Sequence, residues 1–421
     1  MDKKTVRDID VKDKRVLMRV DFNVPLDGST VSDDTRIRAA LPTIEYLLEQ
    51  GASLVLMSHL DRPKGKVVPS MSLKPAADRL AELLGKDVAF APDCVGPESE
   101  SMANALKPGE VLVLENLRFH PEEEGKVKLA DDASDDDKAA AKAEMKEQQK
   151  AFAAQLAELG DVYVDDAFGT AHRAHASMAV VTEQIDNCVS GFLLEKEIQY
   201  LGQAVASPER PYVAVIGGAK ISGKIDVLMN LMDKVDAIIV GGAMVYTFYR
   251  AKGLPTGNSL IEDDRIELAK ETLAKVEEKG VKFLLPIDHV VANISNPKDY
   301  RPDTPTKTVE EDGIEDGWMA LDVGPKSVEL FSKAIADAKT VVWNGPMGYF
   351  EIPVFAEGTT AIARKLAETG CVSIIGGGDS VSAVNKSGLS DQMTHMSTGG
   401  GASLEFLEGK DLPGIMALDD K

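Results

Sequence analysis

The sequence predicts an α/β protein with two doubly wound parallel-sheet (Rossmann-like) domains joined by a helical hinge. Short apolar runs alternate with segments of helical spacing, a pattern typical of parallel sheets with helices on both faces. These runs form two series along a chain of 421 residues, which is longer than one ordinary core accommodates. The two series therefore indicate two domains.

The first series of predicted strands comprises Arg15–Val20, Leu54–Met57, Val111–Leu114 and Val162–Val164. The second comprises Tyr212–Ile216, Ala237–Val240, Phe283–Leu285, Val341–Trp343 and Val372–Ile375. Predicted helices between the strands include Ala39–Glu49, Pro75–Leu84 and Thr359–Glu368. We place the domain boundary near Asp186–Ser190, with domains at 1–188 and 189–406, and expect Phe192–Leu201 to form the joining helix.

Composition limits the classes of function. The net charge of −22 argues against a nucleic-acid binder, which needs a basic face. We expect no membrane span and no signal peptide, because no run of about 18 apolar residues occurs and Met1–Thr5 is polar. Cys94, Cys188 and Cys371 are widely spaced, which predicts neither a disulfide framework nor a metal cluster and fits the cytoplasm.

An acidic and alanine-rich segment, Lys126–Lys150, interrupts the first half of the chain. Its head contains Asp131, Asp132, Asp135, Asp136 and Asp137. Carboxylates at the start of a helix are stabilised by the helix dipole. We therefore interpret the segment as a solvated surface insertion with a capped helix.

Polar and basic side chains follow the predicted strands of the first half. They are Asp21, Asn23, Arg36, His59, Arg62, Arg118 and Arg173. A lone arginine after a strand usually makes only a surface ion pair. Several that converge where parallel strands end can bind carboxylate or phosphate oxygens. This half therefore predicts a site for a small, hydroxylated, multiply anionic molecule. His172 and His175 have zinc-ligand spacing but no third ligand nearby in sequence, so we interpret them as structural.

Glycine-rich loops follow the strands of the second half. Gly218–Lys224 matches G-x-x-x-x-G-K, but Ile225 occupies the position where a P-loop carries a magnesium-binding Ser or Thr. We expect Lys220 and Lys224 to share one helical face and to add charge beside backbone N–H groups. Magnesium must then be held elsewhere, and Asp379, at the start of a predicted helix, is the natural ligand.

Further loops are Gly241–Ala243, Trp343–Pro346, Gly376–Ser380 and Ser397–Ser403. A nucleotide site in one half and an anion site in the other favour a phosphotransferase. A nicotinamide-dependent dehydrogenase is a rival, but the glycine spacing is wrong for it and the two lysines have no role there. A non-catalytic anion-binding protein is another rival, and it would not need Asp379 or the lysine pair.

Several motifs resemble those of the phosphoglycerate kinase family. In the first half they are Arg19–Pro25, Asp34–Arg38, Ser58–Pro63 and Asp166–Arg173. In the second half they are Gly217–Lys220, Trp343–Pro346, Gly376–Asp379 and Ser397–Ser403. The matches run in family order from about Arg15 to Lys410. Departures are modest: Asp165 stands where many members have Asn, Ser380 where many have Thr, and Ala243 where a glycine is frequent.

The resemblance implies a monomeric, hinge-bending kinase of glycolysis. Its N-terminal domain would bind 3-phosphoglycerate or 1,3-bisphosphoglycerate, and its C-terminal domain ADP or ATP with Mg²⁺. The tail 407–421 would pack back on the first domain.

The resemblance also implies a role for each candidate residue. Asp21 and Asn23 would hold the glycerate hydroxyl. Four residues would bind the phosphate and its surroundings: His59, Arg62, Arg118 and Arg173. Arg36 and Lys220 would act on the transferring phosphoryl group, assisted by amides near Gly377 and Gly400. Asp379 would hold magnesium, and the other nucleotide contacts would be Gly218, Ala219, Lys224, Gly242, Asn344, Glu351, Gly378 and Ser380.

Overall fold

The computed structural model describes residues 2–127, 129 and 133–421, and the chain divides into two compact units. Unit 1 contains Met1–Gln199 and Asp411–Lys421, and unit 2 contains Tyr200–Lys410. Helix α6 (Phe192–Ala206) contributes to both units, since the division falls between Gln199 and Tyr200. No helix among the described residues is both long and apolar enough to cross a membrane.

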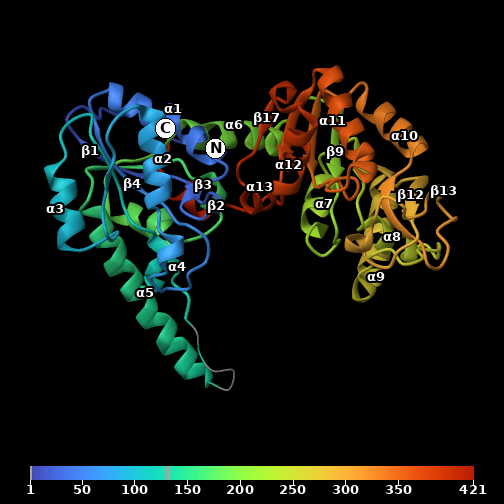
Figure 1. Ribbon diagram of the computed structural model, residues 1–421, viewed down its shortest axis with the longest axis horizontal. Helices are drawn as coiled ribbons and strands as arrows, with labels where there is room; N and C mark the ends of the chain where they lie inside the picture. The colour runs from blue at the N-terminus through green and yellow to red at the C-terminus, as the bar shows by residue number, and fades with distance from the viewer. Residues whose placement is uncertain (1, 128, 130–132) are drawn as a thin grey trace. The chain divides into compact units, whose positions relative to one another are not determined.

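Unit 1 is built on a six-stranded parallel sheet of order β5-β6-β4-β1-β7-β8. Two of its strands, β1 and β4, are labelled in Figure 1. Its strands are β1 (Arg15–Arg19), β4 (Ser53–Met57), β5 (Ala89–Phe90), β6 (Val111–Val113), β7 (Val162–Asp165) and β8 (Cys188–Ser190). A separate two-stranded hairpin joins β2 (Leu26–Asp27) to β3 (Thr30–Val31). The helices are α1 (Thr35–Glu49), α2 (Lys74–Leu84), α3 (Pro97–Ala105), α4 (Pro121–Glu124), α5 (Asp135–Ala157) and α14 (Pro413–Met416).

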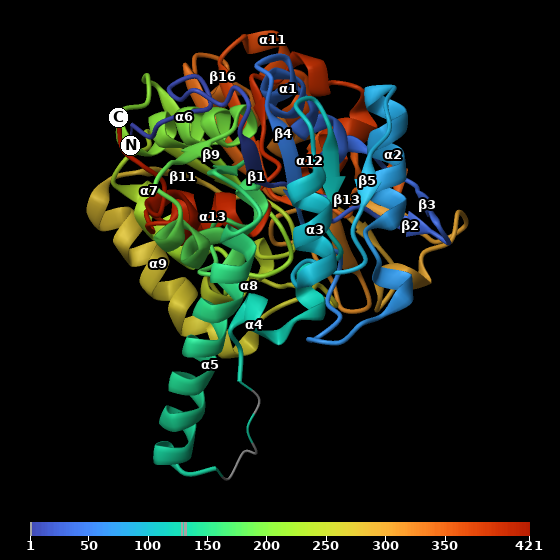
Figure 2. The same cartoon turned by 90° about the vertical axis from the view of Figure 1, so that its left-hand side faces the viewer.

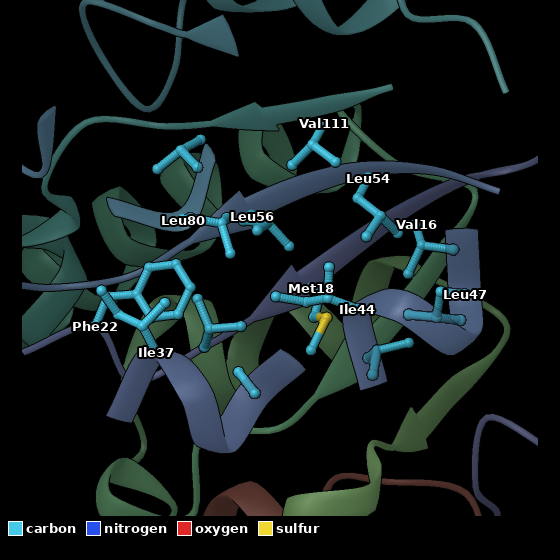
Figure 3. Close-up of a cluster of buried hydrophobic side chains, with 14 of the residues drawn as sticks. Val16, Met18, Phe22, Ile37, Ile44, Leu47, Leu54, Leu56, Leu80 and Val111 are labelled. Atoms are coloured by element: carbon cyan, nitrogen blue, oxygen red, sulfur yellow. The ribbon is translucent and has the colours of Figure 1, made fainter. Parts of the chain in front are cut away.

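The core of unit 1 forms between one face of this sheet and the apolar faces of α1 and α2. Val16, Met18, Leu54 and Leu56 alternate along β1 and β4 and meet α1 residues such as Ile44 (Figure 3). Successive strand side chains point to opposite faces, so the intervening residues are buried on the other side. Burial on both faces explains why these strands read as continuous apolar runs.

Helix α5 extends away from the rest of unit 1 as an arm (Figures 1 and 2). Its N-cap is Ser134, whose hydroxyl accepts a hydrogen bond from the Asp137 amide at 3.1 Å. Asp135, Asp136 and Asp137 lie in the first turn, which confirms the predicted acidic cap, while Asp131 and Asp132 are outside the described residues. Burial occurs only near the C-terminal end, at Phe152, Ala153 and Leu156, so most of the helix is solvated as predicted.

The C-terminal residues of the chain pack on unit 1. The Gly414 amide in α14 donates to the Ala171 carbonyl at 2.8 Å, and Lys3 forms a bridge with Asp420. The Lys3 ammonium also donates to the Leu418 carbonyl at 2.7 Å. Residues from both ends of the chain therefore belong to the same folded unit.

Unit 2 is built on a second six-stranded parallel sheet, of order β11-β10-β9-β15-β16-β17. Its strands are β9 (Tyr212–Ile216), β10 (Ala237–Val240), β11 (Lys282–Leu284), β15 (Thr340–Asn344), β16 (Val372–Gly376) and β17 (His395–Met396). The helices are α7 (Ile225–Met232), α8 (Val245–Ala251), α9 (Ile266–Lys279), α10 (Pro325–Ile335), α11 (Glu357–Thr369), α12 (Gly378–Ser387) and α13 (Gly401–Leu407). The predicted α/β class with two parallel sheets is thus confirmed.

Unit 2 also contains a three-stranded antiparallel sheet that the sequence did not predict. Its strands are β12 (Asp288–Ala292), β13 (Thr306–Glu310) and β14 (Met319–Val323), in the order β13-β12-β14. The edge strand β13 alternates exposed and half-buried residues, with two threonines, a lysine and a glutamate among its five. An edge strand with one solvated face lacks the continuous apolar run used to find the other strands.

Candidate functional site

The carboxyl ends of β1 and β4 and the start of α1 position polar side chains in unit 1. Arg36, in the first turn of α1, donates from Nη1 to Asp21 Oδ2 at 2.8 Å, and the Arg36 side chain is 39% exposed. Asn23 Oδ1 accepts the Asp61 amide at 2.8 Å. Asp21 and Asn23 lie two residues apart after β1, so their polar atoms stay near the end of the sheet.

Arg19 is a member of this cluster that the sequence analysis did not select. It ends β1 and is completely buried, and its Nη2 lies 3.1 Å from His59 Nδ1. Its Nε donates to Ser177 Oγ at 2.9 Å. Burial, together with repulsion from Arg19, Arg118, His175 and Arg36, holds the pKa of His59 well below its usual range. The sequence feature that could have identified Arg19 is a charged residue at the end of an otherwise apolar strand.

Arg118 and Arg173 share the carboxylate of Glu124. Arg118 Nε and Arg173 Nη1 each lie 3.9 Å from Glu124 Oε1, and Arg118 Nη1 donates to the Asp61 carbonyl at 2.8 Å. Burial and the Arg19 charge lower the pKa of Arg118 to about 10 against the pull of Glu124. Arg118 Nε is buried without a hydrogen-bond partner among the described residues. This donor is available to an anion.

Arg62 is exposed, and within the described chain the structure gives it no hydrogen bond or ion pair. Of the seven residues selected in unit 1, six therefore lie together through direct contacts or close charges, and Arg62 does not. The six are Asp21, Asn23, Arg36, His59, Arg118 and Arg173.

Glu123 is a buried counter-charge beneath this basic cluster, and it too escaped the sequence analysis. Its Oε2 accepts the Ser177 amide at 3.0 Å, its Oε1 accepts the Ser177 hydroxyl at 2.7 Å, and His175 Nδ1 lies 3.5 Å away. Burial by itself raises the pKa of Glu123, but His175, the Arg19 charge and Ser177 outweigh it and hold the pKa at about 2. The carboxylate is thus ionised and balances buried positive charge.

Asp165, at the end of β7, is a buried carboxyl whose pKa is shifted in the opposite direction to that of Glu123. Its Oδ1 accepts the Ala167 amide at 2.9 Å, while its Oδ2 has no partner among the described residues. Burial raises the pKa of Asp165 from 3.8 to about 7, although the Ala167 hydrogen bond and Arg19 oppose this. Between about pH 4 and pH 7 the folded state therefore binds a proton that the unfolded state has lost. The contribution of Asp165 to the stability of the folded state therefore falls as pH rises from about 4 to about 7.

We therefore expect Asp165→Asn to melt at a higher temperature than the wild type at pH 8, because the amide cannot ionise. The difference should narrow at pH 5, where the wild-type carboxyl is protonated. Thermal unfolding followed by circular dichroism at both pH values measures this. Asp135→Asn is the control, since that side chain is exposed and should show no pH-dependent difference. A lower melting temperature for Asp165→Asn at pH 8 would contradict the expectation.

In unit 2 the loops after β9, β10 and β15 are joined by backbone hydrogen bonds. The Gly218 amide donates to the Pro346 carbonyl at 3.1 Å, and the Gly242 amide donates to the Met347 carbonyl at 2.9 Å. Gly242 has a φ of +69°, and a Cβ there would lie 2.5 Å from the Gly218 backbone. Only glycine allows this approach, which explains the glycine-rich sequence of these loops.

These loops line a cleft of about 590 Å³ within unit 2. Its lining includes the selected residues Gly218, Ala219, Gly242, Glu351 and Asp379. Apolar side chains such as Met319, Leu321 and Phe350 line it as well. A cleft with an apolar wall and glycine loops can hold a flat ring and a phosphate chain.

Lys220 and Lys224 do not lie on one helical face, so that prediction was wrong. Helix α7 begins only at Ile225; Lys224 lies in the turn before it, and Lys220 lies in the loop that precedes this turn. Lys220 is exposed, whereas Lys224 is half-buried and donates to Asn344 Oδ1. Burial lowers the pKa of Lys224 to about 8, although Asp379 and Glu408 favour its charged form. The two lysines therefore occupy different environments.

The loop after β16 leads into α12. Gly377 is the N-cap of α12, which begins at Gly378, and Asp379 is exposed in its first turn, as predicted. The neighbouring Ser380 is fully buried, and its hydroxyl accepts the Gly345 amide at 2.5 Å. That contact gives Ser380 a role in holding two loops together. Gly400, the N-cap of α13, has a φ of +47°.

Comparison with known proteins identifies the family. The family model described as phosphoglycerate kinase matches residues 6–410. A phosphoglycerate kinase of Chloroherpeton thalassium is 56% identical over the whole of both chains. Another, of Rippkaea orientalis, is 56% identical over 98% of this chain and 97% of its own.

Solved structures agree with the sequence relatives. The phosphoglycerate kinase structure from Coxiella burnetii has a TM-score of 0.84 at 38% identity and covers 99% of this chain and 98% of its own. That from Pyrococcus horikoshii has a TM-score of 0.81 at 30% identity, with the same coverage. By sequence and by structure, this chain belongs to the phosphoglycerate kinase family.

Proposed function

We propose that the basic cluster of unit 1 binds the glyceric acid phosphate and that the cleft of unit 2 binds the nucleotide. The reaction is the glycolytic, reversible transfer of the acyl phosphate of 1,3-bisphosphoglycerate to ADP, giving 3-phosphoglycerate and ATP. One observation carries the assignment of sites. Unit 1 concentrates buried arginines at the end of one sheet, and unit 2 concentrates glycine loops around a cleft.

Such a transfer needs charge neutralisation and alignment more than proton transfer, because the acceptor in the reverse direction is already a carboxylate. Arg36 is assigned to the transferring phosphoryl group and to the carboxyl end of the acid. His59, Arg62, Arg118 and Arg173 are assigned to its phosphate, and Asp21 and Asn23 to its hydroxyl. Arg118 Nε supports this assignment, since it is a buried donor without a hydrogen-bond partner among the described residues.

The nucleotide contacts are assigned to the loops of unit 2. Gly218, Ala219, Gly242 and Glu351 line the cleft, and the remaining assigned residues end or follow the strands β9, β15, β16 and β17 of the same sheet. They are Lys224, Asn344, Gly377, Gly378, Ser380 and Gly400. Lys220 is assigned to the phosphoryl group in transfer.

We assign magnesium to Asp379, because its carboxylate is exposed at the cleft and oxygen is the ligand that Mg²⁺ prefers. Ile225 provides no hydroxyl at the position that a P-loop uses. When bound, the ion would neutralise charge on the nucleotide phosphates. Asp379 also lies close enough to Lys224 to stabilise its charged form, so the carboxylate and the ammonium serve one site.

The two lysines should respond differently to removal. Lys220→Ala should mainly lower turnover, because the exposed ammonium acts on the phosphoryl group in transfer. Lys224→Ala should also weaken ADP binding, since this lysine lies among the loops that hold the nucleotide. Isothermal calorimetry with ADP and steady-state kinetics measure the two effects. Lys333→Ala on the surface of α10 is the control, and equal ADP affinity in the two site variants would reject the distinction.

Asp379→Asn should raise the magnesium concentration needed for half-maximal activity, because the amide is a weaker ligand than the carboxylate. The measurement is a magnesium titration at fixed total nucleotide. Glu357→Gln, which changes an exposed acid at the start of α11, is the control. A titration identical to that of the wild type would exclude Asp379 as a ligand.

With the two substrates assigned to different units, transfer requires a hinge-bending motion that brings them together and excludes water. We also propose that the enzyme acts as a cytoplasmic monomer without nucleic-acid or membrane partners, which its net charge of −22 favours. A coupled assay with 3-phosphoglycerate, ATP and magnesium tests the whole proposal. Activity that does not depend on 3-phosphoglycerate would overturn it.

A further inference from the structure

Three potential metal ligands of unit 1 converge although they come from two separate segments of the chain. Asp93 and Cys94 precede α3, and His120 lies immediately before α4. Their ligand atoms all lie within 4.8 Å of one another. None of the three belongs to the residues assigned above to substrate, nucleotide or magnesium. The wide spacing of the cysteines predicted no metal cluster, but a site of mixed ligands needs only one cysteine.

The separation of these atoms is close to that of a metal site. His120 Nε2 lies 2.7 Å from Asp93 Oδ1, a hydrogen bond in which the ring N–H donates the proton shared with the carboxylate. In a tetrahedral zinc site the metal–ligand bonds are about 2.0–2.3 Å long, so ligand atoms lie about 3.3–3.6 Å apart. Exchanging the shared proton for a metal thus requires shifts of only about 1 Å.

The surroundings allow such shifts but keep the groups oriented. The Asp93 side chain is 51% exposed and that of His120 28%, so solvent reaches one side of the cluster. The His120 ring stacks on Phe152 with centroids 5.1 Å apart, and the Asp93 carbonyl accepts the Ser99 hydroxyl at 2.8 Å. Cys94 is fully buried on the inner side. Because Asp93 and His120 are reached by solvent, water is the fourth ligand that a tetrahedral ion would take here.

The electrostatic environment favours a cation. His120 has the carboxylates of Asp93, Glu122 and Glu123 near it, and these attract positive charge. Glu122 Oε2 is buried without a partner among the described residues. The same acidic side chains, Asp93 and Glu123, lie near the Cys94 thiol. A divalent ion would be attracted by these carboxylates, and a thiol that coordinates such an ion is deprotonated.

We propose that Asp93, Cys94 and His120 form a binding site for a borderline-soft divalent cation, with Zn²⁺ the best match. A mixed set of sulfur, nitrogen and oxygen donors suits zinc, whereas magnesium takes oxygen ligands. As the metal–sulfur bond forms, the Cys94 thiol releases its proton to solvent. His120 must bind as the neutral imidazole, so affinity should rise with pH.

The test uses the full-length protein, free of nucleotide and magnesium, titrated with Co²⁺ as a spectroscopic substitute for Zn²⁺. A thiolate ligand gives an intense cobalt charge-transfer band in the near ultraviolet, which oxygen sites cannot produce. We expect one equivalent of this band in the wild type and its displacement by Zn²⁺. Cys94→Ser should abolish the band. Cys188→Ser and Cys371→Ser should keep it, because these two thiols are buried as Cys94 is but do not belong to the cluster.

The second measurement is zinc affinity by competition with a chromophoric chelator. Loss of an outer-shell partner typically costs about 10–100-fold in affinity, so removing a direct ligand should cost at least about tenfold. We expect that loss in His120→Gln and Asp93→Asn, with circular dichroism confirming that both fold. No charge-transfer band in the wild type, a band unchanged in Cys94→Ser, or unchanged zinc affinity in His120→Gln would each overturn the proposal. These measurements do not depend on kinase activity.

Discussion

Arg36→Ala should lower turnover by roughly a thousandfold, or about 4 kcal/mol of transition-state stabilisation, the scale set by other arginines that stabilise phosphoryl transfer. Arg36 is the assigned residue for this role, and its Nη1 is held by Asp21 at 2.8 Å. Folding should be nearly unaffected, since a partly exposed ion pair contributes at most about 1 kcal/mol. Steady-state kinetics and thermal unfolding on the same sample measure both quantities.

Arg38→Ala is the matched control for Arg36→Ala. Arg38 lies on the same helix, is more exposed, and pairs with Asp34 at 2.9 Å instead of with Asp21. Its removal should change turnover by no more than about twofold, because distant surface charges are screened. Turnover of Arg36→Ala within about tenfold of the wild type would refute the role assigned to Arg36.

Glu123→Gln should destabilise unit 1 by about 3–5 kcal/mol, the cost of breaking a buried ion pair by removing one partner. Glu123 is fully buried, and its loss removes the carboxylate that lies 3.5 Å from His175 Nδ1 and that balances the buried charge of Arg19. Urea unfolding followed by far-ultraviolet circular dichroism measures the change. The chain has two tryptophans, Trp318 and Trp343, both in unit 2, so their fluorescence follows that unit separately.

Glu124→Gln is the control for Glu123→Gln, because Glu124 is the next residue but is 25% exposed and 3.9 Å from its arginine partners. It should cost less than about 1 kcal/mol. The pKa of Glu123 is lowered from 4.5 to about 2 in the folded state, so its contribution is complete above about pH 4.5 and disappears as pH falls towards 2. A Glu123→Gln variant no less stable than Glu124→Gln at pH 7 would contradict this account.

The sequence alone predicted the fold class and most strands of the two parallel sheets. Strands such as Tyr212–Ile216 and Ala237–Val240 are buried on both faces, so their continuous apolar runs identify them directly. The edge strands β5 and β17 have only two residues each, and β13 has a solvated face, so none of them carries that signal. Their pairing depends on neighbours that are distant in sequence.

Within the sites, the sequence determined which residue types follow each strand, because that order is local. The positions of Asp21, Asn23 and Arg118 follow from the strands that precede them. Only the tertiary structure decided how buried each charge is, because burial depends on packing between distant segments. It buried Arg19 beside Ser177, left Lys220 exposed and Lys224 half-buried, and brought His120 to Asp93 and Cys94. The free energy of a charge depends on its solvation and neighbours, so these properties follow from three-dimensional packing.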